Sequence, residues 1–236
     1  MDSKYISIYH EILAKIEDGE IAAGSKLPSE TEMIGEYGAS RDTVRKALHL
    51  LEQNGYIQRI QGKGSFALDI NKLSFPVSGL TSFKELAQKM TEKCRTLVKE
   101  LEKIPADEFI REQLKLPEQA EVWKAVRVRQ IGGKKIILDK DFLDARYVPK
   151  LTQAICEDSI YEHLETKLGL KIGFAQKEVT VQQATQEDRK YLDFENYNMI
   201  VVVKNYTYLE DMTLFQYTES RHRPDKFKFV GFARRN

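Results

Sequence analysis

Two helix starts follow one another closely early in the chain, and they restrict the fold more than any other feature. Ser29 stands three residues before Glu32, the pattern of a capping box, in which each side chain accepts a hydrogen bond from the other residue's backbone. The helix that begins there is short, because Gly38 is a typical helix end. Ser40 then starts another helix, over residues 41–54. This spacing predicts a helix-turn-helix.

A further helix and a hairpin flank this pair. Isoleucines recur at helical spacing over residues 8–16, and Gly19 ends the helix that they predict. Short strands at 56–60 and 65–68 surround a glycine-rich turn, which is typical of a hairpin. Three helices followed by such a hairpin predict a winged helix-turn-helix domain over residues 1–68.

Positive charge is local in this chain. The formal net charge is only +1, so DNA binding has to rest on where the charge lies. The third helix turns an apolar stripe (44–51) inward and carries Arg45 and Lys46 on its opposite face. Arg41 lies in its first turn, and Lys63 lies in the turn of the hairpin. This arrangement predicts DNA binding; an ordinary solvated helix with a hairpin is the alternative.

The rest of the chain has a different pattern. Residues 69–78 lose the periodicity and contain a proline, which indicates a linker. In residues 79–236, strands joined by short polar turns alternate with helices, which favours an antiparallel α+β domain. The expected strands are Thr96–Lys103, Val122–Ile131, Lys135–Leu143, Ile172–Gln182, Met199–Tyr208 and Thr213–His222. The expected helices are Phe83–Met90, Ala106–Leu114, Ser159–Leu168 and Glu187–Leu192.

One expected strand carries two arginines. Alternate residues of 123–131 share a face, and Arg127 and Arg129 lie in the middle of an otherwise apolar face. Two like charges buried together need an anion or carboxylates as partners, and a phosphate matches the fork of arginine. Asp139 lies opposite Arg127 if residues 132–134 form the turn, but a two-residue turn would face it away. A structural arginine–aspartate ladder without ligand is the alternative.

Other polar side chains are candidates for the same site. Ser159 starts a helix that contains Tyr161, and such a start either binds an anion or simply caps the helix. Gln216 and His222 share one face of the last long strand, which points either inward or to solvent. Ser82 lies where the linker enters the domain.

Several classes of protein are disfavoured. Cys94 and Cys156 lie far apart without a CxxC pattern, so we expect two free thiols rather than a disulfide or a zinc site. The sequence has no nucleophile–base pattern and no phosphate-cradling glycine loop, so we expect no enzyme, no metal and no cofactor. A charged N-terminal region without a bilayer-spanning stretch predicts a cytoplasmic protein with no membrane partner.

Four motifs of the first domain form a pattern: LPSE, S-R-x-T-V-R-x-A-L, N-G-Y-I and G-K-G. With them the domain resembles the DNA-binding domain of the GntR family. The resemblance implies operator contacts from Ser40, Arg41, Thr43, Arg45, Gln61, Gly62 and Lys63, and Lys46 lies on the same face. Thr31 stands where many members have an arginine that contacts DNA, so this contact differs here. The resemblance also implies a homodimer on a palindromic operator.

The second domain has its own marks: G-L-T-S-F, Arg127-x-Arg129, D-S-I-Y and the tail R-P-D-K-F-K-F. With them residues 79–232 resemble the UTRA ligand-binding domain of the HutC branch of this family, whose fold is similar to that of chorismate lyase. The resemblance implies phosphate contacts from Ser82, Arg127, Arg129, Ser159 and Tyr161. It implies sugar contacts from Asp139, Gln216 and His222, and some members have glutamate in place of Asp139 and Gln216.

Longer segments narrow the resemblance, among them FPVSGLTSFKELAQ and LFQYTESRHRPDKFKFVGFARR. They are similar to family members that control the use of trehalose. The likeness implies a repressor of a trehalose operon that trehalose 6-phosphate releases from its operator. Because residues 69–78 lead into Ser82, we expect them to be the hinge. Another sugar phosphate, such as glucosamine 6-phosphate, is the alternative effector.

Overall fold

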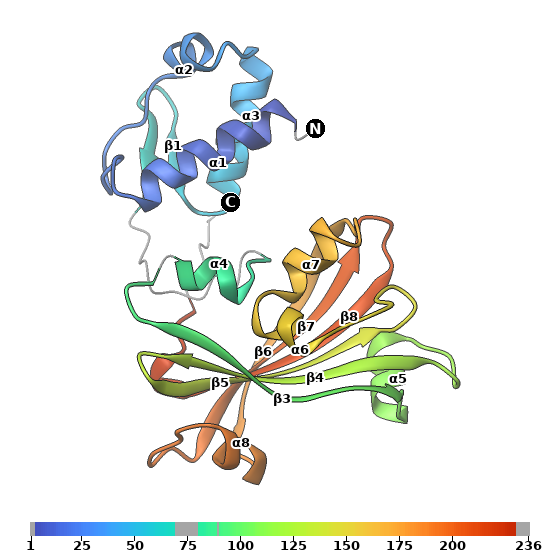
Figure 1. The fold of residues 1–236 in the computed structure, drawn as a ribbon. Coiled ribbons are helices and arrows are strands. Elements are labelled where there is room, and N and C mark those ends of the chain that lie inside the picture. The colour runs from blue at the N-terminus through green and yellow to red at the C-terminus, as the bar shows by residue number, and fades with distance from the viewer. Residues whose placement is uncertain (1–2, 69–79, 89, 230–236) are drawn as a thin grey trace. The chain divides into compact units, whose positions relative to one another are not determined.

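The computed structural model describes residues 3–68, 80–88 and 90–229, and these residues form two compact units (Figure 1). The first unit holds the described residues up to Leu68, and the second holds those from Leu80 onward. The predicted linker and hinge, 69–78, lies outside the described residues, so its boundaries stay a prediction.

The first unit is a winged helix-turn-helix, as predicted. Its elements are α1 (Lys4–Glu17), α2 (Glu30–Tyr37), α3 (Arg41–Gln53), β1 (Ile57–Ile60) and β2 (Gly64–Ala67). The two strands pair antiparallel and form the wing. The first helix ends at Glu17, shortly before Gly19 turns the chain with a φ of 82°.

Side-chain caps start α2 and α3. The backbone N–H of Ser29 donates to Oε2 of Glu32 at 2.7 Å, and the N–H of Glu32 donates to Oγ of Ser29 at 3.3 Å. Gly38 follows α2 with a φ of 52°, a left-handed conformation that suits glycine. The N–H of Thr43 donates to Oγ of Ser40 at 3.2 Å. The turn between the two helices is therefore defined from both sides.

An apolar core fixes which face of α3 points outward. The buried residues that α1 and α3 contribute are Ile8, Ile12 and Ile16 of α1 and Val44, Ala47, Leu48 and Leu51 of α3. Burial of one aliphatic side chain gains about 1.5–3 kcal/mol, far more than differences in helix propensity. The predicted stripe thus packs on α1, and the charged face of α3 remains in solvent.

The second unit is built on a six-stranded antiparallel sheet in the order β3-β4-β5-β8-β7-β6. Its strands are β3 (Cys94–Pro105), β4 (Glu121–Ile131), β5 (Lys134–Asp144), β6 (Ile172–Gln183), β7 (Met199–Leu209) and β8 (Leu214–His222). Each corresponds to a predicted strand, and its ends differ from the predicted ends by at most two residues. The predicted α+β class is confirmed.

Helices cover both faces of the sheet (Figure 1). They are α4 (Phe83–Gln88), α5 (Glu108–Leu114), α6 (Gln153–Glu157), α7 (Ile160–Thr166) and α8 (Gln186–Tyr191), and Pro224–Lys226 form a 3-10 turn. α6 and α7 pack on one face through Cys156 and Leu164, and Leu192, which follows α8, packs on the other. α6 was not predicted, because its five residues are too few to show a helical period.

The hairpin of β4 and β5 combines a short turn with a β-bulge. The turn consists of residues 132–133 alone, and a turn of that length would by itself face Asp139 away from Arg127. A bulge at Ile136 shifts the register by one residue, so Asp139 lies directly opposite Arg127 after all. Neither predicted alternative was complete. The turn has two residues, as the second alternative required, but Asp139 lies on the face of Arg127, as the first one predicted.

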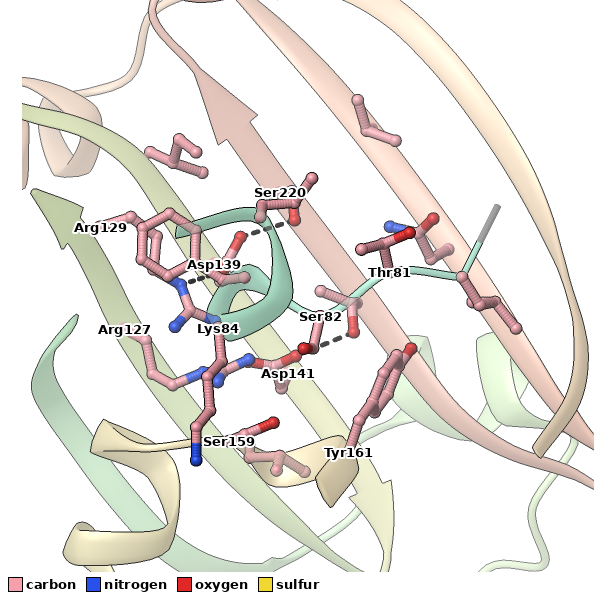
Figure 2. Close-up of a pocket in the computed structure, with 18 of the residues that line it drawn as sticks. Thr81, Ser82, Lys84, Arg127, Arg129, Asp139, Asp141, Ser159, Tyr161 and Ser220 are labelled. Atoms are coloured by element: carbon pink, nitrogen blue, oxygen red, sulfur yellow. Dashed lines mark hydrogen bonds and ion pairs between the residues drawn. The ribbon is translucent and has the colours of Figure 1, made fainter. Parts of the chain in front are cut away.

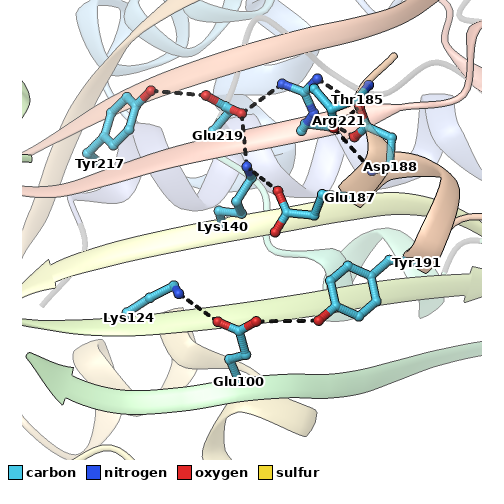
Figure 3. Close-up of polar contacts among 10 residues, drawn as sticks. All are labelled: Glu100, Lys124, Lys140, Thr185, Glu187, Asp188, Tyr191, Tyr217, Glu219 and Arg221. Carbon is cyan, nitrogen blue, oxygen red and sulfur yellow. Dashed lines mark hydrogen bonds and ion pairs between the residues drawn. The ribbon is translucent and has the colours of Figure 1, made fainter. Parts of the chain in front are cut away.

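A buried ion pair fastens α8 to the sheet (Figure 3). Arg221 donates from Nε to Oδ1 of Asp188 at 2.6 Å and from Nη2 to Oδ2 at 2.8 Å. Burial alone would raise the pKa of Asp188, but hydrogen bonds from Arg221 and Thr185 outweigh it and hold the pKa below its usual value. Lys140 of β5 adds an ion pair with Glu187 of α8 at 2.7 Å.

Candidate functional site

The residues predicted to contact DNA all lie on the α2, α3 and wing part of the first unit. They are Thr31, Ser40, Arg41, Thr43, Arg45, Lys46, Gln61, Gly62 and Lys63. All are exposed except Thr43, which is half-buried. The hydroxyls of Ser40 and Thr43 lie 2.8 Å apart at the start of α3. The unit therefore presents one exposed helix face with three cations, next to a wing turn with a fourth.

Glu30 joins the helix face to the wing, which the sequence did not predict. Its Oε2 lies 2.9 Å from Nε of Arg45 on α3, and its Oε1 lies 2.8 Å from Nη2 of Arg59 on β1. The Arg45 side chain is still 54% exposed. Glu30 thus holds two basic side chains in place while leaving most of Arg45 accessible to a phosphate or a base. The signal for it was present in LPSE, but only the fold shows which arginines the glutamate meets.

A cavity of about 170 Å³ lies in the second unit, between the sheet and α4 (Figure 2). Its lining comes from α4, from the start of α7 and from strands β4, β5, β8, β7 and β6. The eight residues predicted to bind an effector all line it. They are Ser82, Arg127, Arg129, Asp139, Ser159, Tyr161, Gln216 and His222. Segments far apart in the sequence are therefore brought to one pocket.

Each arginine of the pocket is held by a carboxylate. Arg127 donates from Nε to Oδ2 of Asp141 at 2.8 Å, and its Nη2 lies 2.7 Å from the same oxygen. Arg129 donates from Nε to Oδ2 of Asp139 at 2.7 Å and from Nη1 to Oγ1 of Thr96 at 2.7 Å. Burial alone would raise the pKa of Asp139, but the two guanidinium groups outweigh it and keep the pKa low. All four charged groups are buried.

The face of β8 points inward and supports the carboxylates. Ser220 donates to Asp139 at 2.6 Å, and Thr218 and Gln216 donate to Asp141 at 2.9 and 3.2 Å. The solvent-facing alternative for this strand is therefore wrong. The Oε1 of Gln216 is buried without a hydrogen-bond partner among the described residues. A buried acceptor of this kind favours a ligand that carries a hydroxyl donor.

Three hydroxyl groups lie around the arginines. Ser82 and Ser159 each accept a backbone N–H at 3.2 Å, from Glu85 and Glu162 respectively, so both cap a helix as well as line the cavity. The Tyr161 hydroxyl lies 3.3 Å from Oγ1 of Thr207. Burial raises the pKa of Tyr161 to about 12, so its hydroxyl is neutral and can donate at pH 7.

The helix α4 forms the cover of the cavity. The ring of Phe83 lies 4.7 Å from the guanidinium carbon of Arg129, in a cation–π contact. The Nζ of Lys84 lies 2.8 Å from Asp158 and 2.7 Å from Glu162 of α7. The cover is thus attached both to the cavity floor and to the neighbouring helix.

His222 is the last residue of β8 and lines the cavity together with Gln216. It is buried, and burial lowers its pKa to about 4, although Asp139 partly opposes the shift. The imidazole is therefore neutral at pH 7 and can both donate and accept hydrogen bonds.

Sequence reasoning missed other residues of the cavity. Asp141 stands two positions after Asp139 on the same strand face, so the alternation that placed one could have placed both. Lys177 of β6 and Asn205 of β7 also line the cavity. No local pattern marks them, because the order of strands in the sheet decides that they reach it.

The chemistry of the cavity suits an anion that also carries hydroxyl groups. It offers guanidinium N–H groups and hydroxyls for the anion, and carboxylate, amide and imidazole groups for hydroxyls. Over residues 3–68, 80–88 and 90–229, His, Cys, Asp and Glu side chains do not gather in threes as a metal ion would require. In the same ranges, no helix combines the length and apolar character needed to cross a bilayer.

The two units match two known domain families. Residues 4–66 match the bacterial regulatory proteins of the gntR family, and residues 89–228 match the UTRA domain. The chain belongs to the GntR family. As a GntR regulator with a UTRA domain it has DNA and a small-molecule effector as its partners.

Relatives of this GntR regulator match almost the whole chain. The HTH-type transcriptional regulator TreR of Bacillus subtilis (strain 168) is 53% identical over 233 residues, which are 99% of this chain and 98% of that protein. The mannosyl-D-glycerate transport/metabolism system repressor MngR of Escherichia coli (strain K12) is 30% identical, over 98% of this chain and 96% of that one. This GntR regulator is a transcriptional repressor of the TreR type.

Solved structures agree with this assignment. The effector binding domain of the B. subtilis trehalose repressor (TreR) is 50% identical with a TM-score of 0.56, and it covers 60% of this chain and 99% of that one. The possible transcriptional regulator YydK from Bacillus subtilis subsp. subtilis str. 168 is 26% identical with a TM-score of 0.80, over 98% of this chain and 100% of that one.

Proposed function

We propose that this GntR regulator represses a trehalose-utilisation operon and leaves its operator when trehalose 6-phosphate binds the cavity. The observation that carries the proposal is the pair of buried arginines, Arg127 and Arg129, in a cavity that also presents hydroxyl-binding groups. The likeness to TreR over nearly the full chain supports the choice of sugar. No turnover of the effector is part of the proposal.

The phosphate is bound by those guanidinium N–H groups of the two arginines that do not donate to the carboxylates. A guanidinium has five N–H donors. Arg127 uses Nε and Nη2 towards Asp141, and Arg129 uses Nε and Nη1 towards Asp139 and Thr96. Each arginine therefore retains donors for a second anion, with its orientation already fixed. The arginine–aspartate ladder is thus a support for a phosphate site rather than an alternative to one. The hydroxyls of Ser82, Ser159 and Tyr161 complete the site.

The sugar is held at the β5–β8 side of the cavity. Gln216 presents a buried acceptor, Asp139 presents carboxylate oxygens, and neutral His222 presents ring nitrogens. These groups suit hydroxyls. Glucosamine 6-phosphate fits less well, because the arginines already neutralise the charges of Asp139 and Asp141 and Gln216 brings no charge to meet an ammonium group.

The effector acts by a population shift. A homodimer, in the cytoplasm, binds a palindromic operator through its two α3 helices and wings. Trehalose 6-phosphate binds more tightly to dimers whose DNA-binding domains are placed wrongly for the two half-sites, so operator affinity falls. A coupling of about 1–3 kcal/mol, or roughly 5–150-fold, is sufficient.

The test uses the full-length protein and two measurements. Calorimetric titration with trehalose 6-phosphate, trehalose and glucosamine 6-phosphate reports which compound binds. Fluorescence anisotropy with a DNA fragment selected from a random pool by the protein itself then reports whether that compound releases DNA.

Binding and release by trehalose 6-phosphate, with little response to the other two, supports the proposal. Binding of glucosamine 6-phosphate instead rejects the choice of sugar. If none of the three compounds binds, the buried arginines are structural and the phosphate site is wrong.

A further inference from the structure

The cavity is long, and its two ends differ. Its lining crosses five neighbouring strands, from β4 with the arginines through β5, β8 and β7 to the edge strand β6. Neighbouring strands lie about 4.8 Å apart, so β4 and β6 are separated by roughly 19 Å across the sheet. A phosphate bound at Arg127 and Arg129 therefore leaves the β6 end to another part of the ligand.

Two polar side chains define the β6 end. Lys177 of β6 and Asn205 of β7 are directly opposite each other in the sheet, so they share a face, and both line the cavity. Lys177 is half-buried, whereas its neighbours Gln176 and Glu178 are exposed. Burial lowers the pKa of the Lys177 ammonium group. A long cationic side chain that could lie in solvent at a sheet edge is instead directed into the cavity.

We propose that Lys177 and Asn205 form a distal subsite that binds the sugar ring farther from the phosphate, so that the cavity selects a disaccharide phosphate over a monosaccharide phosphate. This inference rests on the proposed sugar-phosphate function and adds the residues that distinguish a two-ring ligand from a one-ring ligand.

The chemistry of the two side chains suits a neutral sugar ring. The ammonium group donates up to three hydrogen bonds, and the amide of Asn205 both donates and accepts. Ring hydroxyls accept and donate in the same way, and bonds from a charged donor are stronger than neutral ones. A single hexose phosphate anchored at the arginines leaves this subsite empty, whereas a second ring extends towards β6.

The test compares two ligands on two lysine variants of the full-length protein. Lys177→Met keeps the length of the side chain and removes its donors. Lys204→Met is the matched control, because Lys204 precedes Asn205 on β7, does not line the cavity and forms a 3.9 Å pair with Glu178. Calorimetry gives the Kd of trehalose 6-phosphate and of glucose 6-phosphate for each variant.

The expected result is a selective loss. Lys177→Met should raise the Kd of trehalose 6-phosphate by about tenfold or more and change the Kd of glucose 6-phosphate by no more than about twofold. Lys204→Met should change neither Kd. Unchanged trehalose 6-phosphate binding, or equal weakening of both ligands, would overturn the subsite. Retained binding of glucose 6-phosphate shows that the variant is folded, and a wild type that binds neither ligand rejects the proposed function instead.

Discussion

Arg127 forms its ion pair with Asp141 and not with Asp139, the residue directly opposite it in the sheet. Because this pair is diagonal, Asp139 is available to Arg129. Each of the two arginines in the floor of the cavity therefore has one aspartate as its counterion. Removal of one partner leaves a buried charge without its counterion, which costs about 3–5 kcal/mol.

Asp141→Asn should therefore destabilise the second domain by about 3–5 kcal/mol. Trp123, the one tryptophan of the chain, lies in this domain, so urea unfolding followed by tryptophan fluorescence reports on it selectively. The double variant Arg127→Met with Asp141→Leu should recover most of the stability but bind no sugar phosphate. A loss below about 1 kcal/mol for Asp141→Asn would contradict the role of this pair.

Arg45→Ala should weaken operator binding by about 1–3 kcal/mol if the side chain contacts a base. If it contacts a phosphate, the slope of log K against log salt concentration should fall in magnitude by about one. Effector affinity should not change, because Arg45 lies in the other unit. Fluorescence anisotropy at several salt concentrations measures both quantities. Arg95→Ala, at an exposed position of β3, is the charge-matched control, and equal losses in the two variants would reject a specific contact.

His222 should make the second domain sensitive to mild acid. Its pKa is about 4 in the folded protein and 6.5 in its ordinary state, so the unfolded chain binds the proton more readily between these values. Stability is then complete above pH 6.5 and falls as the pH falls. Between pH 7 and pH 5 the loss should be about 2 kcal/mol. His222→Gln should flatten this part of the urea-unfolding profile, and an unchanged slope would contradict the assignment.

Gln216→Glu should change which sugar phosphate is preferred. The amide of Gln216 donates to Asp141 at 3.2 Å, and a carboxylate in its place would repel Asp141 unless a cation lay between them. The variant should bind trehalose 6-phosphate more weakly and gain affinity for glucosamine 6-phosphate, whose ammonium group supplies that cation. Competition calorimetry measures the ratio of the two affinities; a ratio equal to that of the wild type would show that Gln216 does not contact the sugar.

The sequence predicts most of the fold because its signals are local. The capping box of Ser29 and Glu32, the stripe of α3 and the alternation of β4 each depend on residues a few positions apart. Local signals do not predict contacts that depend on how distant segments are arranged in the fold. Lys177 reaches the cavity only because β6 lies beside β7, and Glu30 meets Arg59 only because the wing folds back towards α2.

The candidate site shows the same division. The arginines could be placed on a buried face from their spacing, and their need for a partner followed from the cost of burying charge. The identity of each partner did not follow, since it depends on a bulge whose position no residue type marks. Ile136 is an ordinary β-branched residue in a strand, and nothing in its surroundings in the sequence indicates an irregularity.

That bulge also limits how the hairpin can evolve. Loss of a single residue between Arg129 and Asp139 would remove the extra position and turn both aspartates to the opposite face of the sheet, leaving the arginines without counterions. Gain of one residue would have the same effect. Descendants of this chain should therefore accept substitutions in the hairpin far more readily than changes in its length, and length changes that survive should come in pairs.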